Sequence, residues 1–166
     1  IAQTLAKQGC TLRLEGAPDA FIGASSALIL PPLTADRLQR GTAAIAEAAA
    51  ARVPAAYLLS VIGADSPSAP SSLGDYGKLE QTLRTAFSSR SVILRTFFYS
   101  SNLLLWASDV QRARALRLPL PSDACLAPLY AGDVSAVVAA LASPGDRQAG
   151  SSGCGRTLAL TGPMWH

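Results

Sequence analysis

The chain has 166 residues, 49% of them hydrophobic and 15% charged, with a formal net charge of +3 at pH 7. This composition excludes a disordered chain, and the length is sufficient for one domain with its own core. We interpret the small positive excess as an ordinary basic surface, although such an excess can also attract anionic ligands such as nucleotides. No run of Lys and Arg with interleaved aromatic residues indicates nucleic-acid binding, and no apolar run reaches the ~20 residues that a membrane span needs.

Cysteine and histidine usage indicates neither a metal site nor a disulfide framework. The three cysteines are odd in number, far apart and without a C-x-x-C pair, and the single histidine is the last residue. The simplest interpretation is a set of reduced thiols in a cytoplasmic protein. These residues are Cys10, Cys125, Cys154 and His166.

The opening of the chain predicts a helix followed by a short strand. Apolar residues at helical spacing indicate a helix over 1–8, ended by Gly9, and alternation indicates a strand over 10–14 that Glu15 closes. In a dinucleotide-binding fold, a helix, a glycine and a strand come in this order after the first strand and its glycine loop. That first strand and that loop are not in this sequence.

The next segment predicts a buried strand and a long helix. Residues 27–30 are apolar, and Pro31 stops the strand that they form. A helix is predicted after Thr34 and up to about residue 52, with the Thr34 side chain expected to cap it, Asp36 in its first turn and many alanines on its packing face. Gly41 lies inside this helix and is expected to weaken it slightly.

The middle of the chain carries the clearest pattern. Two apolar runs of strand length, residues 55–59 and 92–94, enclose a Ser- and Pro-rich loop and a helix predicted over 75–87. Strand, loop, helix and strand in this order are the βαβ unit of a parallel sheet. Ligands of such sheets lie beyond the carboxyl ends of the strands, so the site is expected at Ser60 and at residues 95–102.

The last third predicts two more helices and a final strand, separated by loops rich in Pro, Gly and Ser. These elements are a helix over 102–116 with an apolar side, a short helix over 133–142 and a strand over 157–161. All the elements together predict an α/β fold for a single domain over 1–166. Its sheet is mainly parallel and flanked by helices, with the runs 57–59 and 92–94 as adjacent strands.

Five spaced segments resemble the NmrA-like group of atypical short-chain dehydrogenases/reductases. They are Leu58-Leu59-Ser60, Tyr76-Gly77-Lys78-Leu79-Glu80, Ile93-Leu94-Arg95-Thr96-Phe97-Phe98 with Asn102, Gly132-Asp133-Val134-Ser135-Ala136-Val137, and Leu158-Ala159-Leu160-Thr161-Gly162-Pro163. Their order over residues 20–163 makes the resemblance fairly specific. Members of this group bind NAD(P) with a Rossmann-like fold. They include quinone reductases, relatives of isoflavone reductase, dehydrogenases of fungal ergot alkaloid pathways and proteins that only sense the nucleotide.

The resemblance implies roles for residues near the predicted strand ends. It implies contacts with NADP or NAD for Leu30, Pro31, Ser60, Lys78 and Phe97, and contacts with substrate for Phe98 and Asn102. An acid at the end of the second strand, here Glu15, would bind the adenosine ribose and favour NAD over NADP. Each of these residues also has a plain structural explanation, as a strand end, a helix surface or a core aromatic.

Tyr76 and Lys78 are the candidate catalytic pair. In short-chain dehydrogenases a tyrosine donates a proton to the carbonyl, and a lysine four residues later assists it. The spacing here is two, which places the side chains on different helix faces, so the proton relay of the family is altered. Lys78 is expected to reach a cofactor ribose or a substrate oxygen in the cleft beyond the strand ends. The alternative is a solvated lysine paired with Glu80 or Asp75.

Three functions remain open. The first is an NAD(P)-dependent oxidoreductase that reduces a small carbonyl, imine or quinone substrate, for example in secondary metabolism. The second is a non-catalytic protein that senses NAD(P), and the third is a degenerate fragment that binds no dinucleotide. The G-x-x-G-x-x-G loop, whose amides hold the pyrophosphate, is not in the sequence, and family members continue beyond the point where this chain ends. We therefore expect a shortened or fragmentary chain that binds dinucleotide weakly or not at all.

Overall fold

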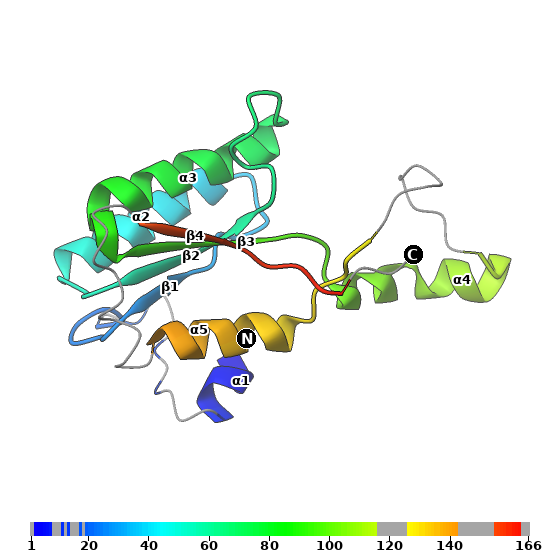
Figure 1. The fold of residues 1–166 in the computed structure, drawn as a ribbon, viewed down its shortest axis with the longest axis horizontal. Helices are drawn as coiled ribbons and strands as arrows, with labels where there is room; N and C mark the ends of the chain where they lie inside the picture. The colour runs from blue at the N-terminus through cyan, green and yellow to red at the C-terminus, as the bar shows by residue number, and fades with distance from the viewer. Residues whose placement is uncertain are drawn as a thin grey trace.

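The computed structural model describes residues 2–7, 11, 13, 17, 19–115, 126–142 and 155–163. Within these ranges the strands form one four-stranded sheet in the order β1-β2-β3-β4, and every pair is parallel (Figure 1). The strands are Ala27–Ile29 (β1), Ala56–Val61 (β2), Ser91–Thr96 (β3) and Arg156–Ala159 (β4). Helices separate the strands along the chain, so the predicted Rossmann-like α/β architecture with a parallel sheet is confirmed.

Helices cover both faces of the sheet, which explains why β1, β2 and β3 carry apolar runs rather than an alternating pattern (Figure 1). On one face lie α2 (Arg37–Ala50) and α3 (Ser71–Phe87), and on the other α1 (Ala2–Lys7) and α5 (Ala131–Ala142). The larger core lies under α2 and α3 and includes Ile29, Ile45, Leu58, Leu79, Leu83, Phe87 and Ile93. The smaller one lies under α1 and α5 and includes Leu5, Tyr57, Val92, Leu94, Val138 and Leu141.

The βαβ unit predicted for the middle of the chain is confirmed. β2 and β3 are adjacent and parallel, in register from Ala56 opposite Ser91 to Val61 opposite Thr96. The helix α3 connects them and is followed by a 3-10 turn, Ser88–Arg90 (η1). The runs that predicted strands at 27–30 and 157–161 correspond to β1 and β4.

The starts of α2 and α3 differ from the prediction. Thr34 does not cap α2: its hydroxyl donates to the Asp36 carboxylate at 2.5 Å, and Asp36 makes no side-chain cap hydrogen bond. Helix α3 begins at Ser71 rather than at residue 75. The Pro70 carbonyl accepts hydrogen bonds from the amides of residues 73 and 74, at 2.8 and 2.9 Å, and so continues the helix towards its N-terminus.

Gly41 brings α2 and α3 close together. A Cβ atom at this position would lie 2.8 Å from the Leu79 Cδ2 atom, closer than carbon atoms pack. The residue that lowers the helix propensity of α2 therefore also permits the contact between the two helices.

The helix predicted over 102–116 is wrong in part. Its place is taken by a 3-10 segment, Ser100–Trp106 (η2), and a short helix, Ala107–Ala113 (α4), which extend away from the sheet (Figure 1). Its expected apolar side is open, with Leu104 75% and Val110 41% exposed. Because helices in proteins are stabilised mainly by packing an apolar face, this segment is not held as one continuous α-helix.

Some predicted features lie outside the described residues. They are most of the strand at 10–14, Glu15 with its expected ribose contact, the three cysteines, and most of the loops at 118–128 and 148–156. In the described ranges, no helix combines the length and the apolar character needed to cross a bilayer.

Candidate ligand site at the carboxyl edge of the sheet

The carboxyl ends of β1, β2 and β3 are each followed by an apolar side chain that remains open to solvent. These residues are Leu30, Ile62 and Phe97, of which Phe97 is the most exposed at 52%. The Ile62 amide donates to the Thr96 carbonyl at 2.9 Å, which places Ile62 beside the start of the segment that carries Phe97. Parallel strands end at one edge of the sheet, so all three lie on the edge where this class of fold binds ligands.

Ser60 ends up inside the protein rather than at this open edge. It is 1% exposed, and its hydroxyl donates to the Glu80 Oε1 atom at 2.6 Å. Its carbonyl accepts a hydrogen bond from the Thr96 hydroxyl at 3.1 Å. The Ser60 side chain therefore faces α3, and the nicotinamide contact expected from the resemblance is not supported by this placement.

Ser60 is the inner end of a polar network that the sequence analysis missed. Arg95 donates to both carboxylate oxygens of Glu80, from Nε to Oε1 at 2.9 Å and from Nη2 to Oε2 at 2.6 Å. The Nη1 atom of Arg95 lies 2.8 Å from the Asp65 Oδ2 atom. We call these four residues, Ser60, Glu80, Arg95 and Asp65, the carboxyl-edge network.

The network runs from the core to the surface. The Glu80 side chain is buried, that of Arg95 is mostly buried, and that of Asp65 is 64% exposed. A bidentate guanidinium–carboxylate pair with a further hydroxyl donor satisfies the buried charge of Glu80. Glu80 and Arg95 both lie in segments that resemble the family, so the sequence pointed to both residues. Because they are 15 residues apart, the sequence did not indicate that they pair.

Charge interactions within the network shift two pKa values. The hydrogen bond from Arg95 holds the pKa of the Asp65 carboxyl below its usual value, and the bond to Glu80 raises the pKa of Arg95. Because folding lowers the pKa of the Asp65 carboxyl, the ionised carboxylate stabilises the fold at pH values above the pKa that Asp65 has in the unfolded chain. This stabilisation is lost as the pH falls through the lower pKa that Asp65 has in the folded state.

Tyr76, near the N-terminal end of α3, is buried. The Arg37 guanidinium carbon lies 4.8 Å from the centre of the Tyr76 ring. Arg37 is itself held by the carbonyls of Pro32 and Ser72, at 2.8 and 2.9 Å. The arginine thus ties the segment after β1 to the first turn of α3 and covers the tyrosine ring.

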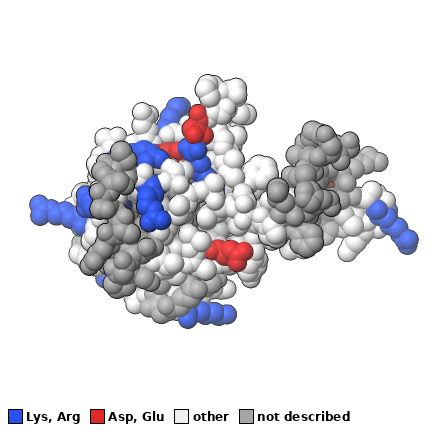
Figure 2. All heavy atoms as spheres, in the orientation of Figure 1, with Lys and Arg blue, Asp and Glu red and all other residues white. Residues whose placement is uncertain are grey.

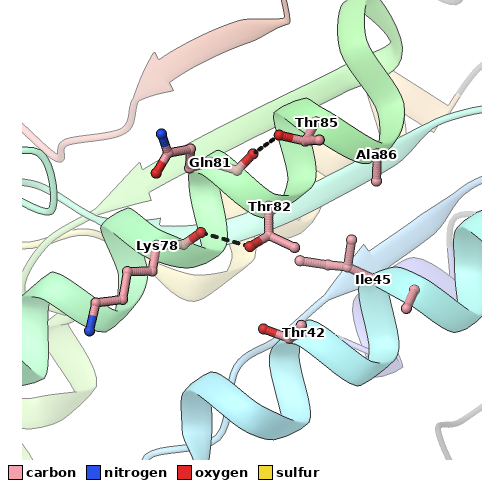
Figure 3. Close-up of a pocket in the computed structure, with 8 residues that line it drawn as sticks. Thr42, Ile45, Lys78, Gln81, Thr82, Thr85 and Ala86 are labelled. Atoms are coloured by element: carbon pink, nitrogen blue, oxygen red, sulfur yellow. Dashed lines mark hydrogen bonds between the residues drawn. The ribbon is translucent and has the colours of Figure 1, made fainter.

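Lys78 lies on the outer surface of α3. Its side chain is 66% exposed, and its ammonium is 3.6 Å from the Asp75 carboxylate. Figure 3 shows it at a shallow hollow between α2 and α3, which residues such as Thr42, Ile45, Gln81 and Thr85 line. Lys78 lies two positions before Glu80, a rotation of roughly 200° about the helix, so Lys78 faces away from Ser60. The structure shows the solvated lysine paired with Asp75, not the expected approach to the cleft.

Replacement of Lys78 by Met is expected to change the free energy of unfolding by less than about 0.5 kcal/mol, because exposed ion pairs are weak. The measurement is urea unfolding followed by circular dichroism. Asp75→Asn removes the other partner and serves as the matched control. A loss of 2 kcal/mol or more, on the order of a buried-group effect, would show that Lys78 is a structural residue instead.

Phe98 and Asn102 belong to the segment beyond β3. The Phe98 ring stacks on Trp106 with 6.0 Å between ring centres. The backbone amide of Asn102 donates to the Tyr99 carbonyl at 2.9 Å. Leu129, just before α5, joins this segment through a parallel bridge to Tyr99. Both predicted substrate residues therefore lie where η2 leaves the sheet, and their role stays a prediction.

On the face that Figure 2 shows, described charges of both signs are mixed. Several basic and acidic side chains lie together in the upper left of the view, and the others stand singly among uncharged residues. Among the described residues no three His, Cys, Asp or Glu side chains lie together in a way that could hold a metal ion.

Known proteins resemble this chain in structure but not detectably in sequence profile. No family model and no curated protein matches the chain. Among solved structures, it is similar to an NADPH-dependent quinone oxidoreductase of Escherichia coli complexed with NADPH, with a TM-score of 0.74 and 23% identity. It is also similar to the triphenylmethane reductase of Citrobacter sp. complexed with NADP(H), with a TM-score of 0.72 and 16% identity. A nucleoside-diphosphate-sugar epimerase of Staphylococcus aureus has a TM-score of 0.70 and 16% identity.

These likenesses cover nearly the whole chain but only part of the other proteins. Each spans 99% of this chain, 58% of the two reductases and 66% of the epimerase. At such identities the likeness establishes the fold. By its fold, this chain is a Rossmann-like α/β protein like the two reductases and the epimerase, and this is the fold that the resemblance to NmrA-like short-chain dehydrogenases predicts.

Proposed function

We propose that the chain supplies the nucleotide-binding sheet of an NAD(P)-dependent oxidoreductase. The observation that carries the proposal is the carboxyl edge of the sheet. There Leu30, Ile62 and Phe97 are exposed to solvent, next to the carboxyl-edge network in which Arg95 pairs with Glu80. Similar structures contain NADPH or NADP(H), and the fold places dinucleotides at this edge. The proposed substrate is a small carbonyl, imine or quinone, to which the reduced nicotinamide supplies a hydride.

The residues of this chain would bind and orient rather than react. Leu30 and Pro31 follow β1 and would pack on the adenosine side of the cofactor, and Phe97 would pack near the nicotinamide. Phe98 and Asn102 would border the substrate. The carboxyl-edge network holds the ends of β2 and β3 in fixed positions beneath these contacts, which is the preorganisation that positioning requires.

The proton that accompanies hydride transfer needs a donor, and Tyr76 is the proposed one. Its ring packs under Arg37 near the N-terminal end of α3, the end that lies towards the carboxyl edge of the sheet. Lys78 points to the opposite side of the helix, so the tyrosine acts without the neighbouring lysine that such relays use.

A second function, nucleotide sensing without turnover, is favoured by one specific observation. Ser60, expected to contact the cofactor, is engaged by Glu80, and Lys78, expected to assist catalysis, is paired with Asp75. A site that orients a dinucleotide without a proton relay would bind it and leave it unchanged. Oxidation of NADPH in the presence of a quinone, followed at the nicotinamide absorbance, distinguishes the two functions.

Titration of the chain with NADPH and NADH is expected to show weak binding without saturation in the micromolar range. The sequence holds no glycine-rich loop to supply amides to the pyrophosphate, so only the contacts of the sheet edge remain. In nitrogen-15 NMR spectra at millimolar nucleotide, the amides of Leu30, Ile62 and Phe97 should shift. Those of Val53 and Arg90, at the opposite edge, serve as controls and should not. Equal shifts at both edges, or none at any residue, would contradict the proposal.

A further inference from the structure

The loop between β2 and α3 is a strap with two fixed ends. Its first end is held where Ala64 is buried and its carbonyl approaches α3: a Cβ on Gly77 would lie 2.4 Å from that oxygen. Its second end is Pro70, whose carbonyl accepts the first backbone bonds of α3. Residues 65–68, between these ends, are exposed.

Most polar contacts of residues 65–69 are local to the strap. The Ser66 amide donates to the Gly63 carbonyl at 3.1 Å, and the Ala69 amide donates to the Ser66 carbonyl at 3.0 Å. Ser66 and Ser68 share a hydroxyl contact at 3.0 Å. Among the hydrogen bonds and ion pairs of the described residues, only the one between Asp65 and Arg95 joins this strap to a strand of the sheet.

We propose that the Asp65–Arg95 ion pair is a latch that holds the 65–69 strap against the carboxyl edge of the sheet. When the pair is broken, residues 65–69 move away as a unit while Ala64 and Pro70 stay in place. The strap begins three residues after Ile62, whose backbone amide donates to the Thr96 carbonyl beside Phe97. The latch thereby fixes the loop that borders the candidate site.

Arg95 is suited to this role because Glu80 holds its guanidinium independently of Asp65. Two of its nitrogen atoms already bind Glu80, and the third carries the bond to Asp65. An ordinary exposed ion pair is weak partly because two long side chains lose freedom on forming it. Here the bonds to Glu80 already restrict the Arg95 side chain, and the Asp65 side chain is short. Little further conformational freedom is therefore lost when Asp65 pairs with Arg95.

The experiment is hydrogen exchange of individual amides in the intact chain, compared as protection factors so that sequence effects on intrinsic rates cancel. In Asp65→Asn, protection of the Ser66 and Ala69 amides is expected to fall about threefold or more, since a local opening becomes more populated. Asp65→Glu keeps the charge and should restore at least half of the protection. Asp75→Asn removes a partly buried acid that pairs with Lys78 and should leave the strap unchanged.

Core amides decide whether the effect is local. In all variants, the amides of Leu58 and Ile93 should exchange as in the wild type. Unchanged protection of the strap in Asp65→Asn would overturn the latch, as would a fall that includes Leu58 and Ile93 or that Asp75→Asn reproduces. Salt near 1 M, where screening reaches about 3 Å, should loosen the strap of the wild type and not that of Asp65→Asn. No outcome depends on dinucleotide binding, so the latch stands or fails separately from the proposed oxidoreductase.

Discussion

Replacement of Arg95 by Met is expected to lower the free energy of unfolding by about 3 to 5 kcal/mol at pH 7. Methionine keeps most of the length of the side chain but leaves the buried Glu80 carboxylate with the Ser60 hydroxyl as its remaining donor. A buried charge without a counter-charge is far more costly than the original pair is stabilising. Urea unfolding at constant ionic strength measures the change.

Two further variants separate this explanation from a general effect of removing an arginine. Arg112→Met removes an equivalent charge from an exposed pair with Asp109, 2.9 Å away, and should cost less than about 1 kcal/mol. In the double variant Arg95→Met with Glu80→Gln, the carboxylate is gone and the amide can keep the contact with Ser60. Most of the lost stability should therefore return. If the double variant is as unstable as Arg95→Met alone, the packing of Arg95 and not its charge is what matters.

Replacement of Gly77 by Ala is expected to destabilise the fold by about 2 kcal/mol, although alanine favours a helix more than glycine. The added methyl group would lie 2.4 Å from the Ala64 carbonyl oxygen, and backbone atoms on both sides oppose its accommodation. Either the strap or α3 must shift. Thermal unfolding and urea unfolding both report the change.

Gly74 is the matched control in the same helix. A Cβ atom there would meet nothing within 4 Å, so Gly74→Ala should stabilise the chain by roughly 0.5 to 1 kcal/mol. Opposite signs at two glycines three residues apart would show that the contact with Ala64, and not helix propensity, decides the outcome at residue 77. Destabilisation at both positions would contradict this account.

The Tyr76-Gly77-Lys78 segment thus has a structural explanation that differs from its catalytic one. The tyrosine fills the space under Arg37, the glycine admits the Ala64 carbonyl, and the lysine remains in solvent. Packing alone can therefore explain this family-like segment, apart from the proton-donor role proposed for Tyr76. The NADPH titration and the quinone assay address the chemistry separately.

Sequence alone determined the sheet of this protein. Strands buried on both faces must be apolar at every position, and runs such as 55–59 and 92–94 are too short for helices of that character. A helix between two such strands makes their pairing parallel, since the chain has to return to the same edge before the second strand begins. Parallel pairing in turn determines that Leu30 and Phe97 share the edge at which folds of this class bind ligands.

Only the tertiary structure decided what the polar residues at that edge do. Whether Glu80 is a surface acid or a buried counter-ion depends on the rotation of α3 about its own axis, which packing of Leu79 and Leu83 against the sheet sets. Local sequence supplies no information about which charge lies opposite, because Arg95 belongs to another element. The same rotation places Lys78 on the solvent side of α3. The helix predicted at 102–116 has no surface to pack against, and the 3-10 segment η2 and the short helix α4 form in its place. Strand patterns are local and follow from burial, whereas side-chain pairing depends on contacts between residues that are distant in the chain.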